Sequence, residues 1–200
     1  GLTDFLRRAA QVNASGTASI CGGMKLTWRE TLDRVSKTAA LLECLGVKPN
    51  DRVGIIANNS ARFLEMLFAI PWCGAVVAPL NTRWSVAESS EIAIDLECSI
   101  IVTDKANLGR TLDILSRMPY PPRILVLDGT APEGAVSLEP ALINCPSRSD
   151  ARRKGDDLAM ICFTGGTTGR SKGALLTHAG MYTNVLQWIT AVQASPRDKL

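Results

Sequence analysis

Apolar positions along the chain follow two spacings, one typical of amphipathic helices and the other of buried strands. Helical spacing places Leu32, Val35, Ala39 and Leu42 on one side of a first predicted helix. Short apolar runs rich in Val and Ile alternate with further helical stretches. The predicted strands span residues 53–57, 75–78, 100–102, 124–127, 158–163 and 173–176. Because helices separate most of these strands, the pattern predicts an α/β fold with a mostly parallel sheet flanked by helices.

Local signals set the ends of the predicted helices. Thr27 with Glu30, and Ser85 with Glu88, have the spacing of capping boxes, in which each side chain bonds the other residue's backbone N–H. Gly46 is placed to end the first helix. The predicted helices begin near residues 27, 60, 85, 108 and 177.

Residues 129–156 are rich in Pro, Gly and Ser, and we predict a loop or linker there, before the strand over 158–163. One basic cluster lies in this segment, and acidic residues are interspersed with it. This mixture favours a solvated linker over a nucleic-acid site. The cluster consists of Arg148, Arg152, Arg153 and Lys154, with Asp150, Asp156 and Asp157 beside them.

Bulk properties exclude several function classes. A net charge of +3 is too small to indicate a nucleic-acid partner. The six cysteines contain no C-x-x-C pair, which argues against a zinc site or a disulfide framework, so we predict no metal ligands in this chain and a cytoplasmic location. The longest uncharged apolar stretch, residues 66–80, is too short for a transmembrane segment and is interrupted by Pro71 and Pro79.

The candidate binding site is a glycine- and threonine-rich loop that follows the predicted strand over 158–163. Glycines let the backbone approach a ligand closely, and successive amides in such a turn can form an anion-binding nest. Threonine hydroxyls and a lysine ammonium add donors and a positive charge, so the loop suits a polyphosphate. The predicted binding residues are Thr164, Gly165, Gly166, Thr167, Thr168, Gly169 and Lys172.

Two other nucleotide motifs fit this loop worse. In a P-loop, Gly-Lys precedes Ser or Thr, whereas here Lys172 follows Ser171 and precedes Gly173. The spacing Gly165-Gly166-x-x-Gly169 is also not the Gly-x-Gly-x-x-Gly of dinucleotide sites. From composition alone, a glycine-rich hairpin without a ligand stays open.

The complete string from Thr164 to Gly173 resembles the phosphate-binding signature of the adenylate-forming superfamily, Thr-Ser-Gly-Thr/Ser-Thr-Gly-x-Pro-Lys-Gly. It departs from that pattern at two positions. Gly165-Gly166 stands where the family has Ser-Gly, and Ser171 replaces the usual proline. Neither change removes a donor that a phosphate needs.

Weaker resemblances lie upstream, at Leu26–Glu30 and at Ala69–Asn81, so that the likeness runs from about residue 24 to about residue 190. Leu176-Thr177-His178 and Pro79-Leu80-Asn81-Thr82-Arg83 look most like the acyl-CoA synthetase branch. The chain is therefore similar to AMP-forming ligases, which join a carboxylic acid to CoA through an acyl-adenylate.

The resemblance implies ATP, a carboxylic acid and CoA as substrates, Mg²⁺ held by a ligand outside this chain, and Lys172 as the catalytic residue that contacts the β- and γ-phosphates. Family members are more than twice as long, and their acidic Tyr-Gly-x-Thr-Glu block and C-terminal catalytic lysine are absent here. We therefore expect residues 1–200 to be an incomplete N-terminal part of a larger adenylation domain, inactive alone. A homodimer is possible, and a non-catalytic nucleotide- or phosphate-binding module is the alternative.

His178 is the single histidine, which rules out a His-based pair or triad within this chain. Its position beside the predicted cap at Thr177 favours a structural or edge-of-pocket role. We expect the four tryptophans to pack in the core or between subdomains. These are Trp28, Trp72, Trp84 and Trp188.

Overall fold

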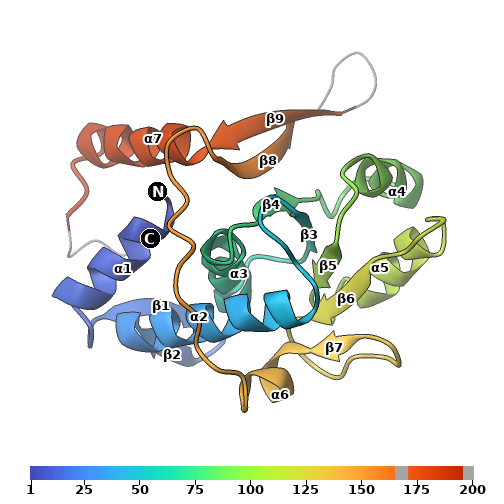
Figure 1. The fold of residues 1–200 in the computed structure, drawn as a ribbon, viewed down its shortest axis with the longest axis horizontal. Coiled ribbons are helices and arrows are strands. Elements are labelled where there is room, and N and C mark those ends of the chain that lie inside the picture. Colours follow the sequence, from blue (N-terminus) through green and yellow to red (C-terminus); the bar gives the residue numbers. More distant parts are fainter. Residues whose placement is uncertain (165–170, 196–200) are drawn as a thin grey trace.

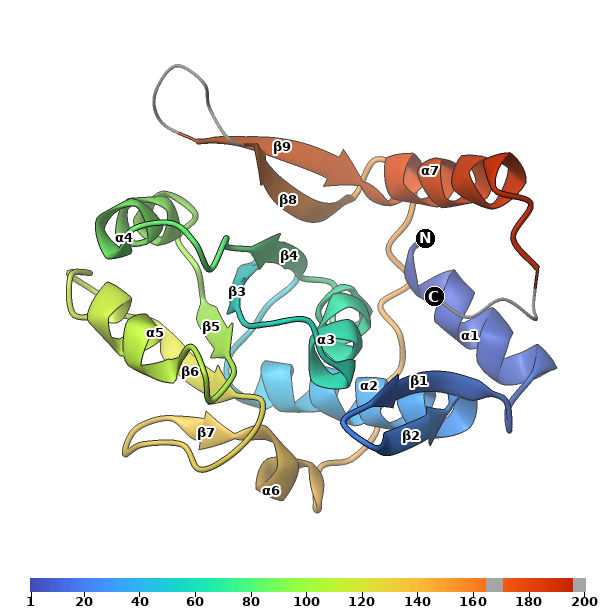
Figure 2. The ribbon, with the colours of Figure 1, turned by 180° about the vertical axis from the view of Figure 1, so that it is seen from behind.

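The computed structural model describes residues 1–164 and 171–195. Helices α2 (Trp28–Cys44) and α3 (Ala61–Trp72) cover one face of a central sheet, and α4 (Val86–Asp95) and α5 (Leu108–Leu115) cover the other. Figures 1 and 2 show these three layers from opposite sides, with the β8–β9 hairpin and helix α7 (His178–Ala191) extending along one end of the molecule.

The central sheet has the strand order β7-β6-β5-β3-β4-β8-β9. Every neighbouring pair is parallel except β8 with β9, which is antiparallel. The prediction of a mostly parallel sheet flanked by helices is therefore confirmed. The strands are β3 (Arg52–Ile56), β4 (Val76–Pro79), β5 (Ile100–Thr103), β6 (Arg123–Val126), β7 (Val136–Ser137), β8 (Leu158–Thr164) and β9 (Lys172–Thr177).

Helix α2 begins and ends where the local signals predict. The Thr27 hydroxyl accepts the Glu30 N–H at 3.2 Å, and the Glu30 carboxylate accepts the Thr27 N–H at 2.8 Å, which completes a capping box. At the other end, Gly46 has a φ of 100°, a conformation that glycine adopts without steric cost. Its N–H donates to Glu43 O, and the Val47 N–H donates to Leu42 O, so the last turn is satisfied.

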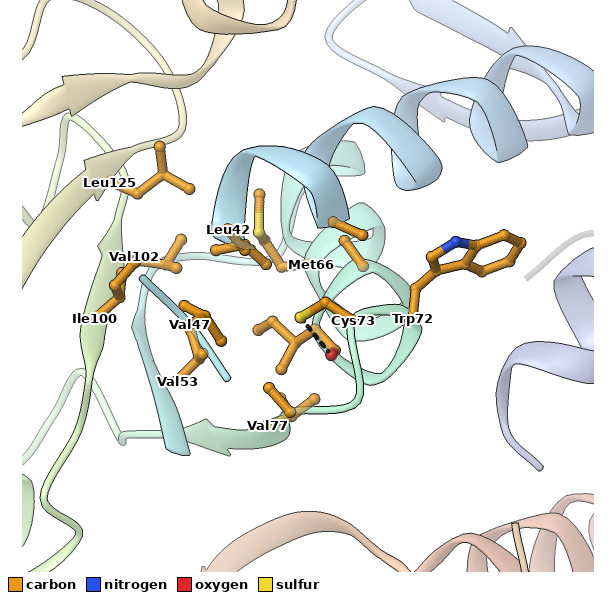
Figure 3. Packing of buried hydrophobic residues seen from close by; sticks show 14 of the residues in the cluster. Leu42, Val47, Val53, Met66, Trp72, Cys73, Val77, Ile100, Val102 and Leu125 are labelled. Atoms are coloured by element: carbon orange, nitrogen blue, oxygen red, sulfur yellow. Dashed lines mark hydrogen bonds between the residues drawn. The ribbon is translucent and has the colours of Figure 1, made fainter. Parts of the chain in front are cut away.

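Alternation along the strands divides the core between the two faces of the sheet. One cluster joins Val53, Val102 and Leu125 to residues of α2 and α3, as Figure 3 shows with Leu42 and Met66. The neighbouring strand positions face α4 and α5. That second cluster includes Val76, Ala78, Ile92, Ile101, Ile114 and Ile124. Parallel strands buried on both faces account for the uninterrupted Val- and Ile-rich runs in the sequence.

Several elements of the described residues were not predicted from the hydrophobic pattern. Helix α1 (Thr3–Val12) packs Leu6, which is fully buried, into the same cluster as α2 and α3. A two-stranded antiparallel hairpin, β1 (Thr17–Cys21) with β2 (Met24–Thr27), then leads into α2. Both hairpin strands are mostly exposed or half-buried, so they lack the apolar runs that mark the central strands.

Residues 129–156 are not only a loop. They contain strand β7, which extends the sheet, and the short helix α6 (Leu138–Leu142), in which Leu138 is fully buried. The expectation of an irregular segment was wrong for these residues because Pro and Gly on either side obscured a five-residue helix. The remainder has no regular secondary structure and leads the chain to β8.

The basic cluster that follows α6 is not a freely solvated linker. The side chain of Asp150 is only 3% exposed, and it accepts the Thr3 hydroxyl at 2.9 Å and pairs with Arg7 at 3.0 Å. Arg148 pairs with Glu43 at the end of α2, 2.5 Å away, and its carbonyl oxygen accepts the Trp72 indole N–H. These contacts hold Arg148 and Asp150 against α1, α2 and α3, so the prediction of a solvated segment was wrong for these two residues. The side chains of Arg152, Lys154 and Asp156 are exposed, as that prediction expected.

All six cysteines are free thiols. Burial raises the pKa of Cys73 to about 11 and that of Cys98 to about 12, so both remain protonated near neutral pH. Among the helices of the described residues, none is both long and apolar enough to cross a bilayer.

Candidate functional site

The β8–β9 hairpin positions the candidate loop at the edge of the sheet. β8 pairs with its neighbour β4 at a single register position, Val77 with Met160. Beyond that point β8 continues to Thr164 paired only with β9. The two strands therefore form a ribbon that extends past the sheet, with α4 nearby (Figure 1).

The structure describes the two residues that flank the loop. Thr164 and Lys172 are opposite each other in the antiparallel register, and the Thr164 hydroxyl donates to the Lys172 carbonyl at 3.4 Å. Both residues are exposed. The other predicted binding residues lie outside the described part of the chain: Gly165, Gly166, Thr167, Thr168 and Gly169.

Lys172 presents its ammonium to solvent. Among residues 1–164 and 171–195, no carboxylate lies within ion-pair distance of its Nζ. Within this part of the chain, the lysine is thus not committed to an internal salt bridge. An ammonium that is exposed at the root of a loop can reach an anionic ligand at little desolvation cost.

Gly173 shows why the residue after this lysine is glycine. It pairs with Phe163 across the hairpin, and a Cβ at position 173 would lie 2.9 Å from Ile161 Cγ2 and 3.3 Å from Phe163 Cε1. The missing side chain leaves room for these two apolar side chains of β8 on the same face of the ribbon. The glycine is thus needed for packing at the root of the loop.

Trp84, just before α4, and Glu88, in the first turn of α4, contact residues on both sides of the loop. The rings of Trp84 and Phe163 meet edge to face, with centroids 5.6 Å apart. The Ser171 hydroxyl donates to Glu88 Oε1 at 3.1 Å. The sequence predicted a different partner for the Glu88 carboxylate, because the capping-box spacing of Ser85 and Glu88 indicated a bond with the Ser85 backbone N–H.

The predicted second capping box is only half present. Ser85 caps α4, because its hydroxyl accepts the Glu88 N–H at 3.1 Å. The Glu88 carboxylate makes its hydrogen bond with Ser171 instead of completing a capping box at Ser85. A residue 83 positions further along the chain therefore takes the place of the local partner.

The sequence predicted a strand, not a helix, after the loop, and the structure confirms this. Strand β9 follows, and α7 starts only at His178, capped by the Thr177 hydroxyl, which accepts the Gly180 N–H at 3.1 Å. A helix dipole acts within about one turn of the helix end, so it contributes little at the loop. If the loop binds phosphate, as the sequence predicts, the binding would depend on amides, hydroxyls and Lys172.

His178 is 1% exposed and has a structural position. Its ring Nδ1 accepts the Leu2 backbone N–H at 3.1 Å, and the backbone N–H of His178 donates to Asp157 O at 2.9 Å. Its Nε2 is buried without a hydrogen-bond partner among the described residues. Burial lowers the pKa of His178 below 6.5; the N-terminal amine and Arg153 act in the same direction, and Asp157 and Asp150 oppose them.

The tryptophans divide between the core and the surface. Trp72 is 5% exposed, Trp28 is half-buried against the larger core, and Trp84 packs in the core on the α4 side. Trp188 is 44% exposed on α7, so it does not pack in the core of the described chain. Across the described residues, no group of three or more His, Cys, Asp or Glu side chains is arranged to hold a metal ion.

The chain matches known proteins along almost its whole length. The family model for AMP-binding enzymes matches residues 6–200. The 2-succinylbenzoate–CoA ligase of Arabidopsis thaliana is 35% identical over 190 residues, which cover 90% of this chain and 34% of that protein. The chain thus spans about a third of the length of the curated relatives it matches.

Solved ligase structures share the fold. ATP-bound MatB from Rhodopseudomonas palustris superposes with a TM-score of 0.82 at 29% identity, covering 98% of this chain and 38% of that one. The anthranilate CoA ligase AuaEII, in complex with anthranoyl-AMP, has a TM-score of 0.86 at 25% identity, covering 92% of this chain and 36% of that one. With the hairpin geometry and the match over residues 6–200, the chain belongs to the family of AMP-binding enzymes.

Proposed function

We propose that the full-length protein is an AMP-forming acyl-CoA synthetase, which activates a carboxylic acid with ATP and transfers the acyl group to CoA. The observation that carries this proposal is the β8–β9 hairpin, which places Thr164 and an exposed Lys172 at the two ends of a loop with the family signature. Similarity to CoA ligases over about nine-tenths of the chain supports it.

The reaction has two steps. The carboxylate of the acid attacks the α-phosphorus of ATP, which forms an acyl-adenylate and releases pyrophosphate. The CoA thiol then attacks the acyl carbon and releases AMP. A carboxylate is a weak nucleophile and is repelled by the triphosphate, so the enzyme must position the reactants and neutralise charge.

The residues of this chain act on the triphosphate tail. Lys172 would contact the β- and γ-phosphates, where the charge of the leaving pyrophosphate concentrates, and the hydroxyls of Thr164, Thr167 and Thr168 would orient the same oxygens. Because Lys172 is exposed, its ammonium is accessible for this contact with the phosphates.

Mg²⁺ would enter with ATP and neutralise phosphate charge. Near the described ends of the loop, Glu88 supplies a carboxylate, and it is hydrogen-bonded to Ser171. The family resemblance places the protein ligand of Mg²⁺ in an acidic block that this chain does not contain, and we propose the same for this protein.

Substitution of Lys172 by alanine in the full-length enzyme tests the proposal. A hydrogen bond to a charged group contributes about 1.5–3 kcal/mol, so the rate of ATP–pyrophosphate exchange should fall at least about tenfold. Lys25→Ala, which removes an exposed lysine from the distant hairpin β1–β2, is the matched control and should leave the rate unchanged. A Lys172→Ala rate within about twofold of the parent would refute the assignment.

The alternative is a non-catalytic nucleotide- or phosphate-binding module, which would bind ATP·Mg but form no acyl-adenylate. Exchange of labelled pyrophosphate into ATP that depends on an added acid separates the two. We also propose a cytoplasmic location, supported by six free cysteines, and fractionation of cells tests it. A homodimer stays a prediction that sedimentation of the full-length protein checks.

A further inference from the structure

We propose that Glu88 is a positioning residue for ATP, which acts by holding Ser171 and thereby the adjacent Lys172. The inference rests on the proposed function, because it concerns the same loop. It adds a residue that the phosphate-binding signature does not contain and that comes from a different layer of the fold.

The hydrogen bond between Ser171 and Glu88 joins the hairpin to α4. Ser171 directly precedes Lys172, and its hydroxyl lies 3.1 Å from Glu88 Oε1. Glu88 is itself fixed in the first turn of α4, where its N–H donates to the Ser85 hydroxyl. Both Ser171 and Glu88 are half-buried, and a hydrogen bond to a carboxylate is stronger than one between neutral groups.

A second contact fixes the other strand of the hairpin from the same segment. Trp84 meets Phe163, the residue before Thr164, edge to face with an interplanar angle of 85°. Trp84 is anchored in turn, because its N–H donates to Asn81 O at 3.2 Å and its carbonyl accepts a hydrogen bond from Arg110 on α5. The five-residue span from Trp84 to Glu88 therefore contacts the hairpin on both sides of the loop.

The Ser171 hydroxyl can restrict the backbone at this position, which in most of the family is restricted by a proline ring. The signature that this loop resembles has proline there, and a proline ring fixes φ and lowers the entropy lost on ordering. Serine leaves that angle free. A hydrogen bond to Glu88 restricts it by another route, so that Lys172 is held near its working position before the triphosphate binds.

Four variants of the full-length ligase test the inference by steady-state kinetics with ATP varied. Ser171→Ala and Glu88→Ala should each raise KM for ATP about three- to tenfold, with kcat and KM for the acid within twofold of the parent. The double variant should resemble the single variants, because both remove one shared contact. Glu88→Gln keeps an acceptor oxygen and should restore most of the affinity for ATP.

Glu91→Ala is the matched control, since Glu91 is exposed on the same helix one turn on, and its KM for ATP should equal that of the parent. Additive effects in the double variant, or equal changes in KM for both substrates, would overturn the positioning role. Thermal unfolding of each variant shows whether α4 is intact. If the parent enzyme itself makes no acyl-adenylate, the proposed function fails. If Lys172→Ala is impaired but the Glu88 and Ser171 variants have the kinetics of the parent, only the positioning inference fails.

Discussion

At the residue scale, His178 is the clearest example of a side chain whose burial sets its chemistry. It is the first residue of α7 and lies against the start of the chain. Its Nδ1 accepts the backbone N–H of Leu2, which requires an imidazole that is unprotonated at that atom. Desolvation favours the same neutral form. The sequence identified His178 as a structural or pocket-edge residue, but only the packing around Leu2 distinguishes these roles.

The burial of His178 predicts a pH dependence of stability. Because its pKa is lowered from 6.5 in the folded chain, the unfolded chain binds more protons below that pH. The free energy of unfolding should therefore fall as the pH decreases from about 6.5 through the folded-state pKa, and should not change through this group above pH 6.5. Urea unfolding between pH 5.5 and 7.5 measures this.

His178→Asn provides the comparison, because the chain has no other histidine. The variant should lose the slope between pH 5.5 and 6.5, even where its overall stability is lower. An unchanged slope in the variant would show that the effect does not arise from His178.

At the scale of elements, a group of four charged side chains joins α2, α3 and α6. Glu65 on α3 is 1% exposed, and its Oε1 accepts from Arg34 Nε at 2.8 Å and from an Arg62 terminal nitrogen at 2.6 Å. Both arginines also pair with Glu139, so that two positive charges face two negative ones. Removal of the buried carboxylate would leave two partly buried guanidinium groups short of a partner.

We predict that Glu65→Ala lowers the free energy of unfolding by about 3 kcal/mol, as breaking a buried ion pair does. The matched control is Asp33→Ala on α2, which removes an i,i+4 pair with Lys37 whose acidic side chain is 50% exposed. That variant should cost less than about 0.5 kcal/mol. Chemical denaturation of both variants measures the difference, and equal losses would contradict a special role for the buried pair.

The two capping boxes predicted from spacing show what local sequence can and cannot specify. Thr27 and Glu30 form theirs, since both partners lie within one turn. Ser85 and Glu88 have the same spacing, yet only the serine caps the helix. A hydroxyl from the distant hairpin competes for the Glu88 carboxylate, and no spacing rule contains that competitor.

At the scale of the whole molecule, the sheet and both helical layers are present, whereas the chain spans only about a third of its relatives' length. Several large apolar side chains remain exposed on β9, on α7 and at the C-cap of α7. They are Leu175, Tyr182, Leu186, Trp188, Ile189 and Val192. The apolar core of the described residues is divided between two buried clusters, one on each face of the sheet.

We therefore predict that residues 1–200 expressed alone unfold cooperatively but catalyse no ATP–pyrophosphate exchange. Two covered sheet faces provide the hydrophobic stabilisation for folding. The family resemblance places the ribose contact, the magnesium ligand and a second lysine in sequence that this chain does not contain. Circular dichroism during heating and an exchange assay against the full-length enzyme check both halves, and acid-dependent exchange by residues 1–200 would contradict the second.

By itself, the sequence determined the fold class, most strand and helix positions and the family signature of the loop. These features follow from hydrophobic spacing, caps and glycines, whose effects act over a few residues. It did not reveal helix α1, although that helix buries Leu6, nor the exposed β1–β2 hairpin, nor the short elements β7 and α6.

Only the tertiary structure decided which distant groups meet. It buried Asp150 against Thr3, built the Glu65 ion pairs and placed Glu88 and Trp84 against the two strands of the hairpin. Each of these contacts joins residues from separate elements, and which elements lie together follows from the order of strands in the sheet and the packing of helices on it. That arrangement is a property of the whole chain, because burial of every apolar face must be satisfied at once.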